Sequence, residues 1–282
     1  MPEWSSDDVD VNGVRIHYYR TGGDKPPLVL SHGATDDGLC WTRVVRVLES
    51  DYDVIMPDAR GHGLSDAPES GYTSADHAGD LAGLIRSLGL GRPAVGGHSM
   101  GAMTTLRLIA DYPDIASCAI LEDPGFRLGE PQAPAPGKEE PRSAMLRIIV
   151  EAQEHGLEAT MARGRTQSPN WGEAEFQPWA QSKLRVRRAF MNDMGSRRWN
   201  EEWRELLPRV TCPVLLITAD PERGAIVTPE GADEASRLAP TLQVVRLRGA
   251  GHNIRREQFD GFIDAVRPFL AAHVAPTSAR TA

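Results

Sequence analysis

No segment constrains the fold of this 282-residue chain more than residues 97–101, Gly-His-Ser-Met-Gly. An apolar run at residues 93–96 precedes the segment, and a pattern typical of a helix follows it at residues 102–110. A serine at the centre of G-x-S-x-G, between a strand and a helix, is typical of a tight turn that presents a nucleophilic hydroxyl above a sheet. Side chains at the two glycine positions would clash where the strand and the helix cross. The segment therefore predicts a strand–turn–helix unit with Ser99 as the nucleophile.

Segments typical of strands and helices alternate along the first half of the chain. Asn12-Gly13, between two short segments rich in valine, predicts a β-hairpin. Apolar runs at residues 28–30, 54–56 and 118–121 are typical of buried strands, whereas residues 76–88 carry leucine and isoleucine at helical spacing. Alternation of this kind predicts an α/β fold, with a mostly parallel sheet and helices on both faces.

The alternation of strands and helices stops after residue 124 and resumes at residue 213. Residues 130–141 are rich in proline and predict a loop, and residues from about 142 to 205 predict helices only. Four of the six tryptophans lie in this part, which favours either an apolar pocket or packing onto the core; they are Trp171, Trp179, Trp199 and Trp203. We expect a core of residues 1–124 and 207–272, a helical insertion of residues 125–206, and a disordered tail of residues 273–282.

Composition and charge exclude several classes of protein. The chain is 40% hydrophobic and 25% charged, as in ordinary globular proteins, and its formal net charge of −8 argues against a nucleic-acid partner. It has no long apolar stretch and no signal-peptide pattern, so we expect a cytoplasmic protein without a membrane span. Cys40, Cys118 and Cys212 lack metal-ligand spacing and are expected to be reduced and buried. The basic run at residues 183–188 predicts the solvated face of a helix.

Three further turns contain glycine and histidine. Residues 31–34 (Ser-His-Gly-Ala) and residues 58–65 (Asp-Ala-Arg-Gly-His-Gly-Leu-Ser) each follow a predicted strand, and residues 249–253 (Gly-Ala-Gly-His-Asn) lie between the last strand and the last helix. With the serine turn, in this order and spacing, they resemble the α/β-hydrolase superfamily from about residue 12 to residue 272. The resemblance implies a mostly parallel sheet of eight strands, and it implies that the helical insertion is a cap domain that follows the sixth core strand.

The resemblance also implies an active site. Ser99 is the expected nucleophile and His252 the expected base, because the histidine comes last in chain order in this family. The backbone N–H groups of Ala34 and Met100 are the expected oxyanion hole, which stabilises the negative charge that develops on the substrate oxygen. His98 is expected to point away from the Ser99 hydroxyl. We expect no metal ion and no organic cofactor.

Two aspartates compete for the role of the acid that orients His252. Most members of the family place this acid at the fourth position of G-x-x-D after the strand at residues 213–218. Here the glycine is missing, Asp220 comes too early, and Glu222 stands at the expected position. A minority, which includes haloalkane dehalogenases and zearalenone-type lactonases, place the acid after the sixth strand, where Asp123 stands. We favour Asp123 over Asp220, and expect Glu122 to face the opposite side of its strand.

The expected activity is hydrolysis of a carboxylic ester or lactone through an acyl-enzyme, with an apolar or aromatic small molecule as substrate. Dehalogenase and epoxide-hydrolase chemistry is disfavoured because those enzymes carry aspartate where this chain has Ser99. Hydrolysis of a carbon–carbon bond in dienone-type products and cofactor-free perhydrolysis are alternatives within the superfamily. A ligand-binding receptor on a hydrolase fold is the alternative from another class. The sequence leaves open which substrate is used and whether the chain forms a homodimer.

Overall fold

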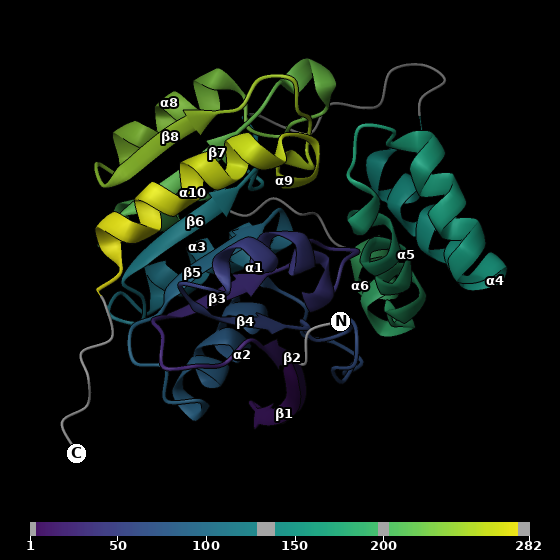
Figure 1. Ribbon diagram of the computed structural model, residues 1–282, viewed down its shortest axis with the longest axis horizontal. Helices are drawn as coiled ribbons and strands as arrows, with labels where there is room; N and C mark the ends of the chain where they lie inside the picture. The colour runs from purple at the N-terminus through teal and green to yellow at the C-terminus, as the bar shows by residue number, and fades with distance from the viewer. Residues whose placement is uncertain (1–3, 129–138, 197–202, 276–282) are drawn as a thin grey trace.

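A central sheet of eight strands organises the computed structural model, which describes residues 4–128, 139–196 and 203–275 (Figure 1). The strand order is β1-β2-β4-β3-β5-β6-β7-β8. Strands β1 and β2 are antiparallel to their neighbours and the other pairs are parallel, which confirms the expected sheet. The bounds are β1 Ser5–Val11, β2 Val14–Arg20, β3 Pro27–Ser31, β4 Asp53–Pro57, β5 Ala94–His98, β6 Cys118–Glu122, β7 Val214–Thr218 and β8 Leu242–Arg246.

The hairpin between β1 and β2 forms where the sequence predicts it. Val11 pairs with Val14, and the two residues between them have positive φ angles, 52° at Asn12 and 74° at Gly13. Positive φ at both central residues is the geometry that matches the twist of a two-residue hairpin, and asparagine and glycine adopt it at low cost.

Helices cover both faces of the sheet. Alternate residues of β6 show this division: Ile120 belongs to a buried cluster with α1 and α10, and Leu121 belongs to another with α2, α3 and α8. The division follows from the alternation of side chains along a strand. The bounds are α1 Thr42–Leu48, α2 Ser74–Ser87, α3 Met100–Asp111, α8 Pro229–Leu238 and α10 Phe259–His273. Cys40, Cys118 and Cys212 are buried and free, as expected.

The described residues between β6 and β7 contain helices and no strand. Helices α4 Pro141–Gln167, α5 Phe176–Arg185 and α6 Arg188–Ser196 gather on one side of the molecule, at the right in Figure 1, and α7 Trp203–Leu206 leads back to the core. Helix α4 is bent at Gly156, which has φ 80° and ψ −176°. The bend folds the two halves of α4 toward each other, so that Arg163 forms an ion pair with Glu151.

The structure describes only part of the predicted proline-rich loop and of the predicted tail. Most of the proline-rich segment, residues 130–138, lies outside the described residues, and α4 already begins at Pro141. Helix α10 continues to His273, so the predicted tail starts too early, and residues 276–282 lie outside the described residues. Within the described ranges, every helix is too short or too polar to cross a membrane.

Candidate active site

Ser99 stands at a strained turn between β5 and α3. Its φ of 53° and ψ of −112° fall in a region that residues with side chains rarely adopt, at a cost of about 1–3 kcal/mol. The turn requires glycine on both sides. A Cβ atom at Gly97 would lie 2.2 Å from the carbonyl oxygen of Gly101, and one at Gly101 would lie 2.3 Å from that of Ser31. The close crossing of backbone segments therefore fixes the place of the serine.

Asp123 contacts His252 directly. Its Oδ2 lies 2.6 Å from His252 Nδ1, and the side chain of Asp123 is fully buried. The carboxylate also accepts backbone hydrogen bonds from Ile226, at 2.8 Å, and Val227, at 3.0 Å. Because an ionised carboxylate only accepts hydrogen bonds, His252 Nδ1 carries the proton and Nε2 keeps its lone pair.

Asp220 lies at the base of the loop that carries His252. Its carboxylate accepts hydrogen bonds from the backbone N–H of Gly249, at 2.7 Å, and from Arg246, at 2.8 Å. These hydrogen bonds lower the pKa of Asp220. Asp220 thus supports the loop, whereas Asp123 contacts the imidazole. Glu222 is exposed, in the short 3-10 helix Pro221–Arg223.

The serine turn and the histidine loop lie against each other. His98 Nε2 donates a hydrogen bond to the carbonyl oxygen of His252, at 2.9 Å, and the two imidazole rings are 4.7 Å apart between centroids. Among the described residues, no hydrogen bond joins Ser99 Oγ to His252. Catalytic hydrogen bonds of free enzymes are often long and tighten when substrate binds.

The orientation of the Ala34 N–H is fixed by its neighbours. This N–H shares a peptide group with the carbonyl of Gly33, which accepts hydrogen bonds from His32 Nδ1, at 2.8 Å, and from the backbone of Asp36, at 3.0 Å. His32 Nε2 accepts a hydrogen bond from the backbone N–H of Ala59, so Nδ1 must be the donor. Burial lowers the pKa of His32 to about 3, and the ring stays neutral.

The turn at residues 58–65 braces the loop at residues 32–36, which we call the oxyanion loop because it carries Ala34, an expected oxyanion donor. His62 Nε2 lies 2.8 Å from the carbonyl oxygen of Ala34, and its Nδ1 lies 3.0 Å from that of Arg60. Arg60 forms a buried ion pair with Asp80 on α2, at 2.6 Å. No local pattern in the sequence predicts the contact between His62 and Ala34, because it joins two loops that are distant along the chain.

An apolar cluster covers the oxyanion loop from the side of the helical insertion. Ala34 and Met100 belong to it together with buried residues of the core and the insertion, which are Tyr72, Ile149, Val186, Phe190 and Met194. None of the described tryptophans of the insertion belongs to this apolar cluster. Trp203 stacks on Phe126, and both belong to the buried cluster between the sheet and α3. Trp171 contacts Trp179, and Trp199 lies outside the described residues. Packing onto the core is therefore the role that the structure gives Trp203.

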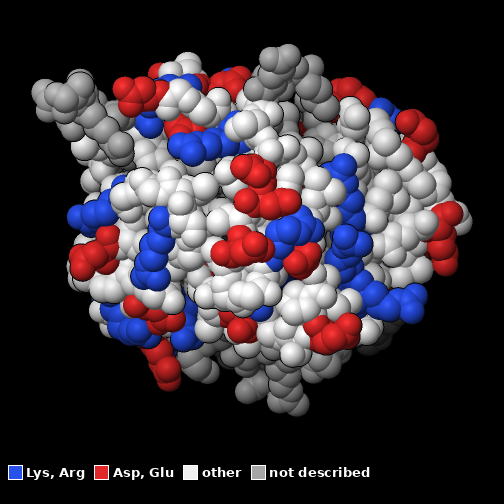
Figure 2. Space-filling model, turned by 90° about the horizontal axis from the view of Figure 1, so that it is seen from below, with Lys and Arg blue, Asp and Glu red and all other residues white. Residues whose placement is uncertain are grey.

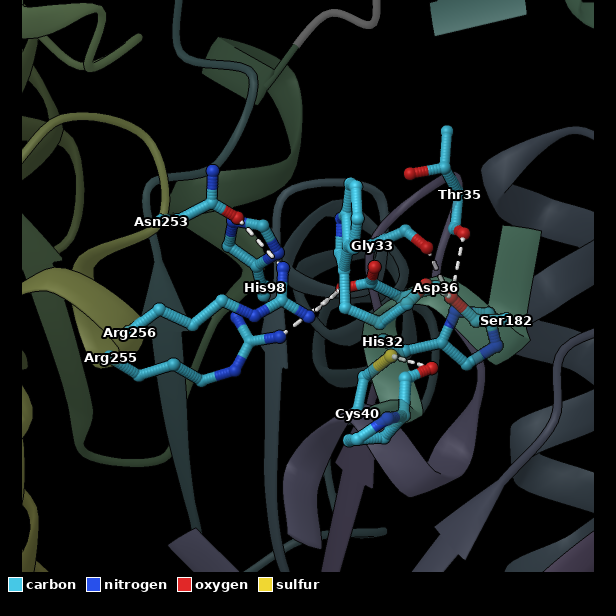
Figure 3. Close-up of polar contacts among 12 residues, drawn as sticks. His32, Gly33, Thr35, Asp36, Cys40, His98, Ser182, Asn253, Arg255 and Arg256 are labelled. Carbon is cyan, nitrogen blue, oxygen red and sulfur yellow. Dashed lines mark hydrogen bonds and ion pairs between the residues drawn. The ribbon is translucent and has the colours of Figure 1, made fainter. Parts of the chain in front are cut away.

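The prediction that residues 183–188 form a solvated face is wrong for Lys183 and Val186. Both side chains are buried, and Lys183 Nζ donates hydrogen bonds to the carbonyl of Thr35 and to Asp36 Oδ1, each at 2.7 Å. Arg255 and Arg256, in the short helix α9 Ile254–Glu257, approach Asp36 from the other side, as Figure 3 shows. On the surface, in the view of Figure 2, basic side chains are interspersed with acidic ones.

Comparisons with known proteins show which family the chain matches. Residues 28–265 match the family model described as the alpha/beta hydrolase family. The 2-(acetamidomethylene)succinate hydrolase of Mesorhizobium japonicum is 28% identical over 275 residues, which cover 94% of this chain and 94% of that protein.

Two solved structures are also similar. N-formylmaleamic acid deformylase from Pseudomonas putida S16 aligns with a TM-score of 0.80 at 27% identity, over 93% of this chain and 100% of the other. An esterase from a Rhodococcus species aligns with a TM-score of 0.76 at 27% identity, over 96% and 99% of the two chains. All three proteins are named as hydrolytic enzymes, and the family match spans most of the sequence. This chain therefore belongs to the alpha/beta hydrolase family.

Proposed function

We propose that this protein is a serine hydrolase in which Ser99, His252 and Asp123 form the catalytic triad. The observation that carries the proposal is the 2.6 Å hydrogen bond between Asp123 and His252 Nδ1, in a loop that packs against the strained serine turn. This bond leaves Nε2 of the imidazole as the free base, which is the state that removal of a proton from serine requires. The alpha/beta hydrolase membership of the chain supports the same chemistry.

In the proposed reaction, Ser99 Oγ attacks the carbonyl carbon of the substrate while His252 Nε2 takes the hydroxyl proton. The backbone N–H groups of Ala34 and Met100 stabilise the oxyanion, and one such donor typically contributes about 2.7–4 kcal/mol. His252 then protonates the leaving group, which departs and leaves an acyl-enzyme. Water attacks the acyl carbon and gives its proton to His252. His252 returns a proton to Ser99 Oγ as the acyl–oxygen bond breaks, which releases the acid and regenerates the Ser99 hydroxyl.

We propose a neutral, apolar ester or lactone as the substrate. The apolar cluster around Ala34 and Met100 supports an apolar acyl or alcohol group. Next to the site, the charged groups of Lys183, Arg255 and Arg256 are paired with buried carboxylates. A carboxylate on the substrate would have to compete with those carboxylates for the same cations, which favours a neutral substrate.

Hydrolysis of an N-acyl compound is the second candidate. The relative from Mesorhizobium japonicum is named for 2-(acetamidomethylene)succinate, and the solved structure from Pseudomonas putida S16 for N-formylmaleamic acid. The same serine, histidine and oxyanion donors serve this reaction, with nitrogen as the leaving atom. Carbon–carbon bond hydrolysis, perhydrolysis and a receptor role remain alternatives, and the following experiment distinguishes hydrolysis from binding.

The test combines a fluorophosphonate probe with a turnover screen. We expect the probe to label the wild-type protein and to leave Ser99→Ala unlabelled. We expect p-nitrophenyl butyrate to be turned over with a higher kcat/KM than a p-nitrophenyl monoester of succinate, because the latter carries a charge. Faster turnover of N-formylmaleamate than of either ester would favour the second candidate. Labelling with no turnover of esters, lactones, N-acyl compounds or dienones would contradict the hydrolase and favour the receptor.

A further inference from the structure

Six buried charged side chains form a cluster beside the proposed catalytic residues. Three are carboxylates and three are cations, and each side chain is at most 4% exposed. We call this group the Asp36 cluster; it consists of Asp36, Glu122, Glu175, Lys183, Arg255 and Arg256. Removing charges from water carries a large free-energy cost, so a buried cluster of charges is weak evidence for added stability. We therefore consider which neighbouring groups the cluster positions.

Asp36 is the centre of the cluster. Its Oδ1 accepts a hydrogen bond from Lys183 Nζ at 2.7 Å, and its Oδ2 contacts Arg256 at 2.9 Å and Arg255 at 3.3 Å. In Figure 3 the two arginines approach this carboxylate from one side, while Thr35 and Ser182 lie on the other. The histidine loop and the helical insertion therefore meet at one carboxylate of the oxyanion loop.

Members of the cluster stand close in sequence to three of the proposed catalytic groups. Asp36 follows Ala34 by two residues, Glu122 directly precedes Asp123, and Arg255 follows His252 by three residues. Glu122 accepts hydrogen bonds from the backbone N–H of Arg255, at 2.8 Å, and from its guanidinium group, at 3.0 Å. A shift of the cluster would consequently move the oxyanion loop, the acid strand and the histidine loop together.

The helical insertion contributes two members of the cluster. Glu175 comes from the 3-10 helix Glu173–Glu175 and lies 3.4 Å from Arg256. Lys183, on α5, also donates a hydrogen bond to the carbonyl of Thr35, at 2.7 Å, and the Ser182 hydroxyl lies 3.2 Å from the same oxygen. Thr35 is bonded directly to Ala34. The insertion thus holds the backbone next to the proposed oxyanion donor.

We propose that Lys183 is a positioning residue that couples the seating of the helical insertion to the geometry of the oxyanion hole. Its ammonium group holds the Thr35 carbonyl and the Asp36 carboxylate, and thereby keeps the Ala34 N–H in the orientation that the oxyanion needs. If α5 moved away from the core, the Ala34 N–H would lose the support that Lys183 provides through Thr35 and Asp36. The inference rests on the proposed serine-hydrolase function, because it assigns a task within that reaction.

The test is the variant Lys183→Met, assayed with the ester that the wild-type protein hydrolyses best. Complete loss of an oxyanion donor reduces kcat by about 10²–10³, so a misaligned donor should reduce kcat by about ten-fold or more, with KM changed by less than about two-fold. An aryl trifluoromethyl ketone, which forms a tetrahedral adduct with a serine nucleophile, should bind more weakly by a factor similar to the loss in kcat.

A matched control is Arg20→Met. Arg20 pairs with the buried Asp53 at the amino-terminal end of β4, so each variant removes one cation from a buried carboxylate. We expect both to lower Tm, and only Lys183→Met to lower kcat at a temperature well below either Tm. If Lys183→Met does not fold, Ser182→Ala and the charge-balanced variant Asp36→Asn/Lys183→Met replace it, with the same expected loss of kcat and of ketone affinity.

The outcomes separate the two proposals. Wild-type kcat and wild-type ketone affinity in folded Lys183→Met, or in its replacement variants, would overturn the positioning role. An equal loss of kcat in Arg20→Met would also overturn it, because the loss would then follow from general destabilisation. A wild-type protein that hydrolyses no acyl substrate and forms no adduct with the ketone would instead contradict the proposed serine-hydrolase function.

Discussion

At the scale of single residues, contacts with His252 separate the two aspartates that the sequence offers as the acid. We expect Asp123→Asn to lower kcat by about 10⁴, because the amide no longer enforces the Nδ1–H tautomer of His252. Asp220→Asn weakens only the support of the histidine loop at Gly249 and should lower kcat by less than about ten-fold. Steady-state kinetics with Tm measured for each variant is the check. A folded Asp220→Asn without activity, beside an active Asp123→Asn, would reverse the assignment.

Single residues also show how far the sequence predicts this site. Ser99 and His252 stand in local motifs whose order indicates their roles, and the structure places their loops in contact. The sequence favours Asp123 as the acid but leaves Asp220 as the alternative. The position of a carboxylate relative to His252 depends on backbone geometry, such as the φ of 42° at Asp123, which local patterns do not contain. For Lys183 the basic run predicts exposure to solvent, which is wrong. Its burial depends on where α5 packs against Asp36, which local patterns do not contain.

At the scale of elements, the predicted strands agree with the structure because short apolar runs are local signals. Helix boundaries agree less well. Helix α2 begins at Ser74, before the predicted Asp76, because Thr73 and Asp76 form a reciprocal capping box. Helix α8 was missed, although Thr228 caps it and Pro229 occupies its first turn. The sequence contains both the capping box and the Thr-Pro pair. They mark the start of a helix through capping side chains, whereas the predictions rest on the spacing of apolar residues.

The bend in α4 is the element whose geometry depends most on one residue. Gly156 has φ 80° and ψ −176°, a conformation open essentially only to glycine. A Cβ atom there would meet no other atom within 4 Å, so substitution causes backbone strain without a clash. We expect Gly156→Ala to lower the free energy of unfolding by about 1–3 kcal/mol in urea titrations. Glu158→Ala, at an exposed position two residues away, should change it by less than about 0.5 kcal/mol. Equal stability of the two variants would show that the bend does not require glycine.

At the scale of the whole molecule, the sequence predicts the α/β core but not how the helical insertion sits on it. Strand and helix periodicities arise within short windows, and the handedness of parallel connections then limits the topology. The seating of the insertion rests instead on long-range contacts. Two of them are the ion pairs Lys183–Asp36 and Arg185–Asp37, which join α5 to the loop after β3. One of these pairs gives the molecule a stability that depends on pH.

Asp37 is buried where the core meets the insertion. Burial, together with the neighbouring charge of Asp58, raises the pKa of Asp37 from its ordinary value of 3.8 to about 7, while Arg185 acts in the opposite direction. Between these two pKa values the folded protein therefore binds a proton that the unfolded chain has lost. The stabilising contribution is fully present below the lower value and disappears as the pH rises through the higher one, with a slope of at most about 1.4 kcal/mol per pH unit.

This linkage predicts the behaviour of Asp37→Asn. Asparagine stays neutral and can still accept the hydrogen bond that Asp37 takes from the backbone N–H of Leu39. Relative to the wild type, the Tm of the variant should therefore increase between about pH 5 and about pH 8, as measured by scanning calorimetry at constant ionic strength. The matched control is Asp220→Asn, because the pKa of Asp220 is lowered and its carboxyl stays ionised across this range. If the linkage holds, the difference in Tm between Asp37→Asn and the wild type varies with pH. If it is as constant with pH as the difference for Asp220→Asn, Asp37 is already ionised at the acidic end of this pH range. In that case Arg185, rather than burial, would dominate the electrostatics of the contact between core and insertion.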